Sequence, residues 1–320
     1  MKVIIQIPCY NEEEVLGATL AALPRQLPGV DAVERLVIDD GSTDRTVEVA
    51  RANGVDHIVR LTTHQGLARG FVAGLEACVR CGADVIVNTD ADNQYRAEYI
   101  AHLVEPILAG RAEIVVGARP IDQIEDFSAT KKLLQKLGSW AVRYASGANI
   151  PDAPSGFRAI SRDAALRLHV FGRYTYTLET VIQAGQKNLA IVSVPVLTNR
   201  ATRPSRLVKS VANYVRRSMF TIFRLFLLYR PLRFFLFLGT IPFVAGLALI
   251  VRWLLLFFLV DSTRARAPSL IVAAVLVLIG VQLWTFGLIA DLLAANRKLL
   301  EDVQYRIRRF EAGTGQAARD

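Results

Sequence analysis

Two carboxylates one residue apart follow closely on a short apolar run, residues 85–88, which predicts a buried strand. In an extended segment alternate side chains point the same way, so Asp90 and Asp92 would face one point in space, with Gln94 next in the series. Oxygen ligands of this kind suit Mg²⁺ or Mn²⁺, and an ion held by two carboxylates keeps positions open for phosphate oxygens. A solvated turn after the strand is the plain alternative.

Two other apolar runs also end in polar residues. Residues 3–7 are followed by Pro8-Cys9-Tyr10-Asn11-Glu12, and residues 35–38 are followed by Asp39-Asp40-Gly41-Ser42-Thr43-Asp44. Ser42 or Thr43 is a plausible N-cap for the next helix. The carboxyl ends of neighbouring parallel strands meet at one edge of a sheet, where ligands collect in open α/β folds. The three polar segments are therefore predicted to build one site.

The order of strand, polar loop and helix repeats along the first part of the chain. Further strands are expected at residues 57–61 and 113–116, and helices at 66–79 and 97–108. Such alternation predicts an α/β domain with a mostly parallel sheet and helices on both faces.

The three polar segments together resemble the signatures of family 2 glycosyltransferases, in the same order and at fitting separations. The resemblance implies a GT-A (Rossmann-like) catalytic domain over residues 1–199 that binds a nucleotide sugar. It implies that Asp39 or Asp40 contacts the base or ribose, and that Arg69 approaches the donor phosphates. The residues that it places around the nucleotide sugar and the metal are Pro8, Tyr10, Glu12, Asp39, Asp40, Arg69, Asp90, Asp92 and Gln94.

Within that family the chain is most similar to the polyprenyl-phosphate glycosyltransferases, the group that includes dolichyl-phosphate mannose synthase. The supporting segments are Gly117-Ala118-Arg119, Asp152-Ala153-Pro154-Ser155-Gly156-Phe157-Arg158, and Val194-Pro195-Val196 leading to Arg200. This resemblance places the acceptor phosphate beside Arg119, Lys131, Lys132 and Ser155, and Arg200 beside the donor diphosphate. The segment after Arg200 departs from the family, because relatives usually show a Gly-containing Ser-Lys motif there.

The chemistry of such an acceptor agrees with these residue types. The oxygen of a lipid monophosphate is already anionic and can attack an anomeric carbon without a strong general base, so the protein must mainly position it and screen repulsion between phosphates. Arg119, at a strand end, and Lys131 with Lys132, at an apparent helix start, suit that task, whereas Arg200 could close over the donor diphosphate. Asp92 is kept as a metal ligand. Glu179 stands where related enzymes with hydroxyl acceptors often carry a catalytic base, and we keep it as a second-line site residue; a helix start is the plain alternative.

The positive charge of the chain is confined to its C-terminal part. Residues 1–199 hold 20 of the 38 basic and 23 of the 29 acidic side chains, whereas residues 200–320 hold 18 and 6. Residues 200–233 carry nine Lys or Arg and no acid, interleaved with apolar side chains, which predicts a basic amphipathic juxtamembrane segment. Nucleic acid would also attract such a stretch, but the apolar segments that follow favour the lipid bilayer and no nucleic acid.

Two uncharged segments, residues 234–251 and 270–290, are long enough to cross a bilayer as helices. We expect transmembrane helices at about 234–256 and 270–290, with Gly239 and Gly246 allowing close helix approach. Arg252 is expected to reach to the far surface, and a contact with lipid phosphate is the alternative. Basic residues before the first and after the second helix predict a cytoplasmic catalytic domain and a cytoplasmic tail over residues 291–320. The tail is expected to be disordered after Phe310.

The cysteines and the N-terminus add two expectations. Cys9, Cys78 and Cys81 fit a reduced compartment, and Cys78-Val79-Arg80-Cys81 is taken as the end of a helix because no second pair accompanies it. The chain begins with a strand of the sheet, so no cleavable signal peptide is expected.

The sequence thus predicts a membrane-anchored, metal-dependent glycosyltransferase that moves a sugar from a nucleotide diphosphate to a polyprenyl phosphate; inversion is implied by the family. Another lipid or a glycan as acceptor is the alternative within the family. A nucleotidyltransferase and an inactive membrane scaffold are the alternatives of other classes. The residues do not identify the sugar, UDP or GDP as carrier, or the prenyl length, and they are compatible with a homo-oligomer.

Overall fold

The computed structural model of the chain describes residues 1–120, 147, 150–170, 176–199, 223–224, 231–260 and 267–317. The chain divides into two compact units, Met1–Ile222 with Gln304–Asp320, and Phe223–Val303. Lys131, Lys132, Arg200 and nearly all of the predicted juxtamembrane segment 200–233 lie outside the described residues.

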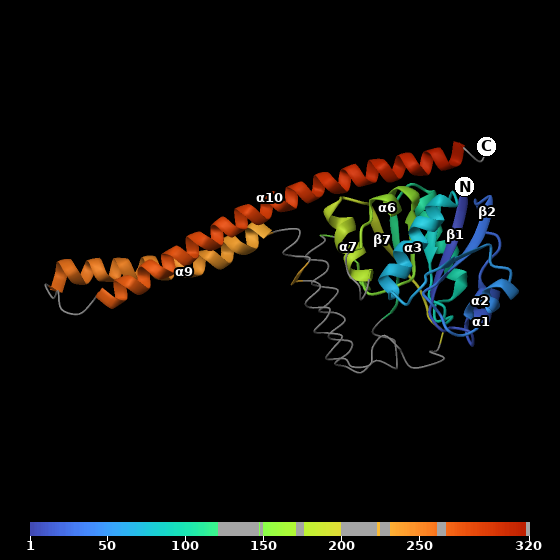
Figure 1. The fold of residues 1–320 in the computed structure, drawn as a ribbon, viewed down its shortest axis with the longest axis horizontal. Coiled ribbons are helices and arrows are strands. Elements are labelled where there is room, and N and C mark those ends of the chain that lie inside the picture. The colour runs from blue at the N-terminus through green and yellow to red at the C-terminus, as the bar shows by residue number, and fades with distance from the viewer. Residues whose placement is uncertain are drawn as a thin grey trace. The chain divides into compact units, whose positions relative to one another are not determined.

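The first unit is built on a seven-stranded sheet (Figure 1). The strand order is β3-β2-β1-β4-β6-β5-β7, and all neighbours pair in parallel except β6, which runs antiparallel between β4 and β5. The strands are β1 (Lys2–Cys9), β2 (Ala32–Asp39), β3 (His57–Arg60), β4 (Val85–Asn88), β5 (Ile114–Ala118), β6 (Arg158–Ser161) and β7 (Ile191–Pro195). The mostly parallel sheet predicted from the sequence is confirmed.

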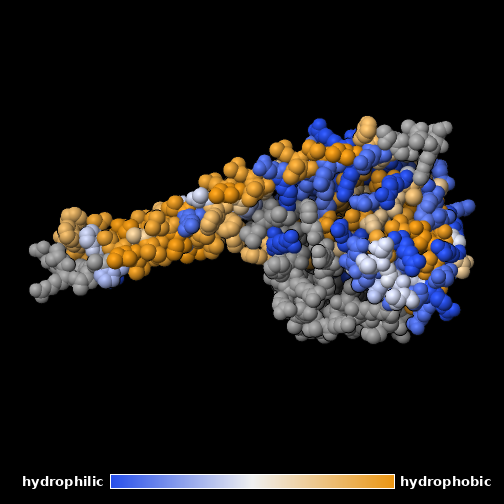
Figure 2. All heavy atoms as spheres, in the orientation of Figure 1, coloured by the Kyte–Doolittle hydropathy of each residue, from blue (hydrophilic) through white to orange (hydrophobic). Residues whose placement is uncertain are grey.

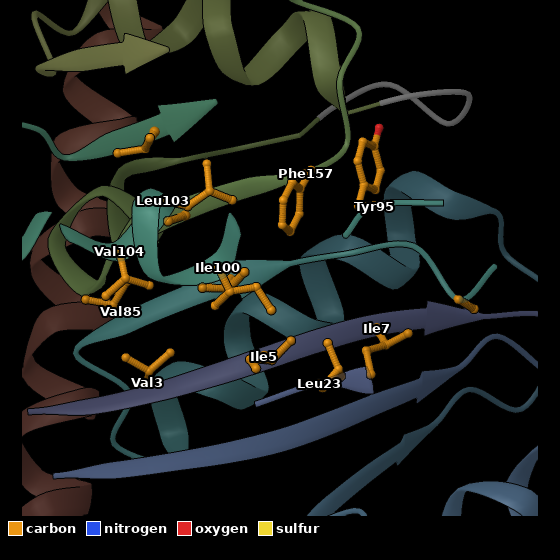
Figure 3. Packing of buried hydrophobic residues seen from close by; sticks show 14 of the residues in the cluster. Val3, Ile5, Ile7, Leu23, Val85, Tyr95, Ile100, Leu103, Val104 and Phe157 are labelled. Carbon is orange, nitrogen blue, oxygen red and sulfur yellow. The ribbon is translucent and has the colours of Figure 1, made fainter. Parts of the chain in front are cut away.

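Alternation along β1 divides the core into two layers. Val3, Ile5 and Ile7 belong to one apolar cluster with Leu20 of α1 and Leu103 of α4 (Figure 3). On the other face Gly70 and Gly74 of α3 contact side chains of β1 and β2. The helices of this unit are α1 (Leu16–Ala22), α2 (Thr46–Ala52), α3 (Leu67–Arg80), the 3₁₀ turn η1 (Ala97–Tyr99), α4 (Ile100–Leu108), α6 (Arg162–Arg167) and α7 (Thr177–Gln186).

The helix cap expected at Ser42 or Thr43 is wrong. Helix α2 begins at Thr46, and the carboxylate of Asp44 accepts the Thr46 amide at 3.0 Å. The Ser42 hydroxyl instead accepts the Asn11 amide at 3.0 Å, and the Thr43 amide donates to the Asn11 side chain at 2.9 Å. These residues are therefore used to join the loop after β2 to the loop after β1.

The second unit contains two long apolar helices, α9 (Pro231–Val260) and most of α10 (Ala267–Ala317). Both are long and apolar enough to cross a membrane, and hydrophobic residues cover them in Figure 2. A Cβ on Gly239 would lie 2.8 Å from the Gly280 carbonyl, and one on Gly246 would lie 2.8 Å from the Ala273 carbonyl. The close helix approach predicted at Gly239 and Gly246 is confirmed.

The disordered tail expected after Phe310 is wrong, because α10 continues to Ala317. The last part of this helix belongs to the first unit and bonds to it. Tyr305 donates to the Asp163 carboxylate, and Arg308 pairs with Glu76 at 3.3 Å. The carbonyl of Ala312 accepts from Arg162 at 3.2 Å. These polar contacts explain why a polar segment stays helical.

Candidate active site

Five strands bring their polar ends to one edge of the sheet. The carboxyl ends of β1, β2, β4 and β5 lie there because these strands are parallel. Strand β6 runs the other way, so its first residue, Arg158, pairs with Asn88 at the end of β4 and with Val116 of β5. The loop before β6 thereby joins the segments after β4 and β5 at the same edge.

Asp90 and Asp92 lie close together, but in a turn rather than in the extended strand that we expected. Strand β4 ends at Asn88, the Asp92 carboxylate accepts the Gln94 amide at 3.1 Å, and Asn93 has a left-handed φ of 53°. Burial and the nearby Asp92 raise the pKa of Asp90 to about 7, Glu12 adds to the rise, and Arg119 opposes it. The turn ends the regular alternation, so metal binding by the Gln94 side chain stays a prediction.

Arg119 is the cation of this edge, and a buried carboxylate fixes its direction. Its Nε donates to Asp152 Oδ2 at 2.7 Å, its second guanidinium nitrogen donates to Oδ1 at 3.1 Å, and its amide donates to Oδ2 at 3.2 Å. The Asp152 side chain is fully buried, while 13% of the Arg119 side chain is exposed. Burial lowers the pKa of Arg119, but Tyr95 and Asp152 outweigh burial and raise it, so Arg119 is a permanent cation.

The loop 152–157 packs directly against Asp90. A Cβ on Gly156 would lie 3.1 Å from the Tyr176 hydroxyl and 3.2 Å from Asp90 Oδ1, so a side chain here would push against both. The Gly156 carbonyl accepts from Asn88 Nδ2 at 2.9 Å, and its amide donates to the Tyr95 hydroxyl at 3.3 Å. The Tyr95 ring stacks on Phe157 with 4.9 Å between centroids (Figure 3). The polypeptide around Asp90 is thus held from several sides.

Asp39 and Asp40 have different surroundings. Both Asp40 oxygens accept amides at 2.8 Å, from Gln65 and Gly66, and Oδ2 lies 2.9 Å from His64 Nδ1. Asp39 Oδ1 accepts the Ser42 amide at 2.9 Å, and its Oδ2 lies 3.3 Å from Nε of Arg60. Asp40 therefore holds the loop before α3, whereas Asp39 keeps one oxygen beside a mostly exposed, movable cation.

Tyr10 and His64 close this side of the site. Their rings are stacked with 3.8 Å between centroids and 25° between planes. Gly41 lies behind them with a φ of +72°, and a Cβ on it would lie 2.7 Å from the Thr63 carbonyl carbon. The backbone of the Asp39–Asp40 loop therefore touches the His64 loop without a side chain between them.

Replacing Gly41 by alanine is expected to displace the His64 loop. The left-handed φ and the backbone contact both oppose a Cβ, so we expect a loss of about 1–3 kcal/mol in the free energy of unfolding. Thermal unfolding measures this loss, and nucleotide titration in the presence of Mn²⁺ is expected to show weaker binding. The control is Gly82→Ala, where φ is equally left-handed at +83° but nothing lies within 4 Å of the Cβ. Equal loss of nucleotide affinity in both variants would contradict the contact argument.

The other predicted residues differ in access. Pro8 is the next-to-last residue of β1 and pairs with Ile38, Glu12 is close enough to Asp90 to raise its pKa, and Arg69 is exposed in the first turn of α3. Ser155 is fully buried, and its hydroxyl accepts the Phe157 amide at 3.3 Å, so a contact with acceptor phosphate stays a prediction. Glu179 is buried in the first turn of α7, with 2% of its surface exposed.

Several residues of the site had no role in the sequence prediction. Asp152 is one of them: it fixes the direction of Arg119 by accepting hydrogen bonds from its guanidinium. Asn88, Tyr95 and Tyr176 are buried polar residues whose partners are distant in sequence, and Arg158 is a buried arginine that bonds to Thr180 as well as to its own loop. A polar Asn at the end of an apolar strand is the one signal that could have indicated Asn88.

The two carboxylates Asp90 and Asp92 fit a divalent cation. Both are oxygen donors of the kind that Mg²⁺ and Mn²⁺ prefer, and a cation would offset the burial and the repulsion from Asp92 that raise the pKa of Asp90. Among the described residues no group of three or more His, Cys, Asp or Glu could hold a metal ion. Cys78 is buried and Cys81 caps α3, in agreement with the structural interpretation of this pair.

Comparison with known protein families shows to which family the chain belongs. Residues 4–168, more than half of the chain and all three of the polar segments, match the family described as glycosyl transferase family 2. The chain belongs to glycosyl transferase family 2. It is 30% identical over 206 residues to the undecaprenyl-phosphate mannosyltransferase of Micrococcus luteus, which spans 61% of this chain and 83% of that protein.

Two further comparisons cover different shares of the chain. The undecaprenyl-phosphate 4-deoxy-4-formamido-L-arabinose transferase of Pectobacterium carotovorum is 28% identical over 328 residues, covering 99% of this chain and 94% of its own. Glucosyl-3-phosphoglycerate synthase of Mycobacterium tuberculosis, crystallised with Mn²⁺ and UDP, has a TM-score of 0.53 and 21% identity, covering 69% of this chain and 79% of its own. The predicted GT-A fold is confirmed, and the family resemblance to polyprenyl-phosphate glycosyltransferases is confirmed.

Proposed function

We propose that this family 2 glycosyltransferase transfers a sugar from a nucleotide diphosphate to the phosphate of a polyprenyl phosphate, with inversion at the anomeric carbon. The observation that carries the proposal is Arg119, a cation locked by buried Asp152 and acting on Asp90 at the strand edge. Such a fixed cation suits an anionic acceptor. Relatives that carry the names of polyprenyl-phosphate transferases support it, as do the two helices that could cross a membrane.

For the donor, we assign Asp39 rather than Asp40 to the base or ribose. Asp40 already accepts two amides and contacts His64, so it is committed to the protein. Asp39 needs only Arg60, whose side chain is 66% exposed, to move aside from its second oxygen. Tyr10 and Glu12 would line the nucleotide pocket, and Arg69 and Arg200 would meet the diphosphate.

Asp90 and Asp92 would hold Mg²⁺ or Mn²⁺, with Gln94 assisting. When bound, the ion supplies positive charge against the diphosphate. The phosphate oxygen of the acceptor attacks the anomeric carbon, and the bond from that carbon to the diphosphate oxygen breaks with both electrons leaving on the nucleotide. Arg119 orients the attacking phosphate and lowers its repulsion from the donor. Because that oxygen is already anionic, the buried Glu179 need not act as a base.

We propose two membrane passes, through α9 and α10, with the catalytic unit on the cytoplasmic face. Arg224 and Arg230 before α9, Arg233 in its first turn and the basic residues after the second span support this orientation, because basic flanks are retained on the cytoplasmic side. Protease digestion of sealed inverted vesicles tests it: the catalytic unit should be cut in these vesicles and protected in right-side-out vesicles.

Metal affinity is expected to depend on pH through Asp90. Its pKa of about 7 in the metal-free site means that metal must displace a proton below that pH. The affinity for Mn²⁺ should therefore fall about tenfold per pH unit below pH 7 and level off above about pH 8. Calorimetric titration with Mn²⁺ alone between pH 5.5 and 8.5 measures this dependence, with Asp90→Asn as the control that lacks the titrating group. An affinity that does not change over this range would contradict the assignment of Asp90.

The transfer assay for the proposed function uses purified full-length protein in detergent. Radiolabelled UDP- and GDP-sugars are each offered with undecaprenyl or dolichyl phosphate, in Mn²⁺, Mg²⁺ or EDTA. Metal-dependent label in the lipid, with inverted anomeric configuration by NMR, is the expected result. Label in another lipid or glycan alone would move the acceptor to the alternative within the family. Nucleotide binding without transfer to any of these acceptors would contradict the proposal.

A further inference from the structure

Arg158 is a fully buried cation directly beneath the candidate site. Its Nε donates to the Ser155 carbonyl at 2.8 Å, and one terminal nitrogen donates to the Ala153 carbonyl at 2.6 Å. The other terminal nitrogen donates to the Thr180 hydroxyl, and the guanidinium lies 5.8 Å from the centroid of the Tyr176 ring. All three of these acceptors are neutral. The molecule thus buries a charge and directs it mainly at the backbone of one loop.

Burying an arginine in this way opposes folding unless the bonds that it makes are needed. Burial lowers the pKa of Arg158, which expresses this penalty. The carbonyls of Ala153 and Ser155 have no regular strand or helix partner in this loop, and the planar guanidinium can bond both at fixed geometry. Lysine, with a single nitrogen, could not reproduce this fork.

The loop that Arg158 holds carries two contacts of the candidate site. At the start of the loop, the Asp152 carboxylate accepts hydrogen bonds from two guanidinium nitrogens of Arg119 and so fixes that side chain. Near its end Gly156 lies against Asp90, where a Cβ would be 3.2 Å from the carboxylate. A shift of this loop by one ångström would therefore move Arg119 and close or open the space at Asp90.

Arg158 also connects this loop to α7. Thr180 lies on α7, and Tyr176 is the N-cap residue of that helix. The Tyr176 hydroxyl accepts a hydrogen bond from Asn88 Nδ2 at 2.8 Å. Asn88 in turn accepts from Gln6 at 2.9 Å and donates to the Gly156 carbonyl. The guanidinium thus bonds the carbonyls of Ala153 and Ser155, and the amide chain bonds that of Gly156, which ties the loop to β1, β4 and α7.

We propose that Arg158 is a positioning residue for the transfer reaction, which holds loop 152–157 so that Asp152 aims Arg119 at the acceptor phosphate and Gly156 keeps the space at Asp90. This inference rests on the proposed function. Arg158 itself touches no substrate, so its role is exerted through the loop. Its loss should impair transfer to the acceptor far more than binding of the donor.

Arg35 provides a matched control elsewhere in the same sheet. It is also a buried arginine, 3% exposed, and it donates to the carbonyls of Leu20, Asn53 and Gly54 at 2.9–3.1 Å. These carbonyls belong to α1 and to the turn after α2, and the predicted acceptor residues are on other segments. Arg35→Met should reduce stability as Arg158→Met does, but without an effect on the acceptor.

The test compares Arg158→Met, Arg158→Lys, Thr180→Val and Arg35→Met in the full chain. For Arg158→Met we expect turnover per folded molecule to fall about 100-fold, with a raised KM for polyprenyl phosphate. The affinities for UDP and GDP, each with Mn²⁺, should change less than about threefold, which is no more than the loss of one weak hydrogen bond would cause. Arg158→Lys should fall between Arg158→Met and the unmodified protein, Thr180→Val should lose less because both loop bonds remain, and Arg35→Met should keep its turnover.

Hydrogen exchange provides a second measurement that needs no acceptor and tells failure of this inference from failure of the proposed function. In Arg158→Met, faster exchange should be confined to amides of loop 152–157 and the start of α7. Exchange spread over β4, β5 and β6, or unchanged in the loop, would overturn the inference. Equal turnover in Arg158→Met and Arg35→Met, or nucleotide affinity falling in step with transfer, would also overturn it. No transfer by the unmodified protein would count against the proposed function alone.

Discussion

Asp92→Asn is expected to reduce sugar transfer by about 1,000-fold or more while the protein stays folded and inserted in the membrane. Asparagine has nearly the same shape but removes one of the two negative charges that would hold the divalent ion. Without the ion, the charge of the departing diphosphate is not neutralised, and electrostatic terms of this kind are among the largest in catalysis. Initial rates with saturating donor and Mn²⁺ measure the effect, and Mn²⁺ titration should show a parallel loss of metal affinity.

The matched control for this variant is Asp84→Asn. Asp84 precedes the same strand, β4, at its opposite end, where its carboxylate accepts the Lys2 amide at 2.8 Å. The same chemical change there should lower stability slightly and leave turnover within about twofold, because surface changes outside a site are usually small. The metal assignment fails if Asp92→Asn retains full turnover, or if the two variants lose equal activity.

Arg119→Met is expected to reduce transfer to polyprenyl phosphate by about 100- to 1,000-fold, because it removes the cation that orients the acceptor phosphate. The effect should be larger on acceptor use than on donor binding. The same change leaves the buried Asp152 carboxylate without the charge of the Arg119 guanidinium, which is expected to destabilise the fold by about 3–5 kcal/mol. Rates at varied acceptor concentration, nucleotide titration and thermal unfolding measure the three effects.

A double variant separates the catalytic from the structural effect of Arg119. In Arg119→Met with Asp152→Asn the buried charge is gone, so much of the lost stability should return, while transfer should stay low. If transfer returns together with stability, Arg119 is a structural residue and the acceptor assignment is wrong. Equal loss of donor binding and acceptor use in the single variant would also count against it.

The part of the fold that could be predicted is the part with regular apolar patterning. Strand β4, for example, is three apolar residues followed by Asn88 and then by further polar residues, and its position and end match the expectation. Strand β6 was not predicted, because it is four residues long, begins with a charged arginine and pairs only with strands distant in sequence. Its antiparallel direction is what brings loop 152–157 to the site.

The candidate site shows the same limit. Asp90, Asp92 and Arg119 were found because they follow strands whose ends must meet. We expected Asp90 and Asp92 to face one point because they alternate along an extended strand. That geometry is wrong, since the left-handed Asn93 turns the chain within the segment. The partners that fix them, such as Asp152 for Arg119, depend on tertiary contacts that no local pattern encodes.

The central claim is that an anionic lipid phosphate is the nucleophile, and a direct comparison of acceptors tests it. Purified protein is given its preferred labelled nucleotide sugar and Mn²⁺ with either a polyprenyl monophosphate or the corresponding polyprenol, at equal concentration in the same detergent. The account predicts labelled lipid from the monophosphate and none above background from the alcohol. Equal or faster transfer to the alcohol would contradict it, because a hydroxyl acceptor requires a base and gives Arg119 no phosphate to orient.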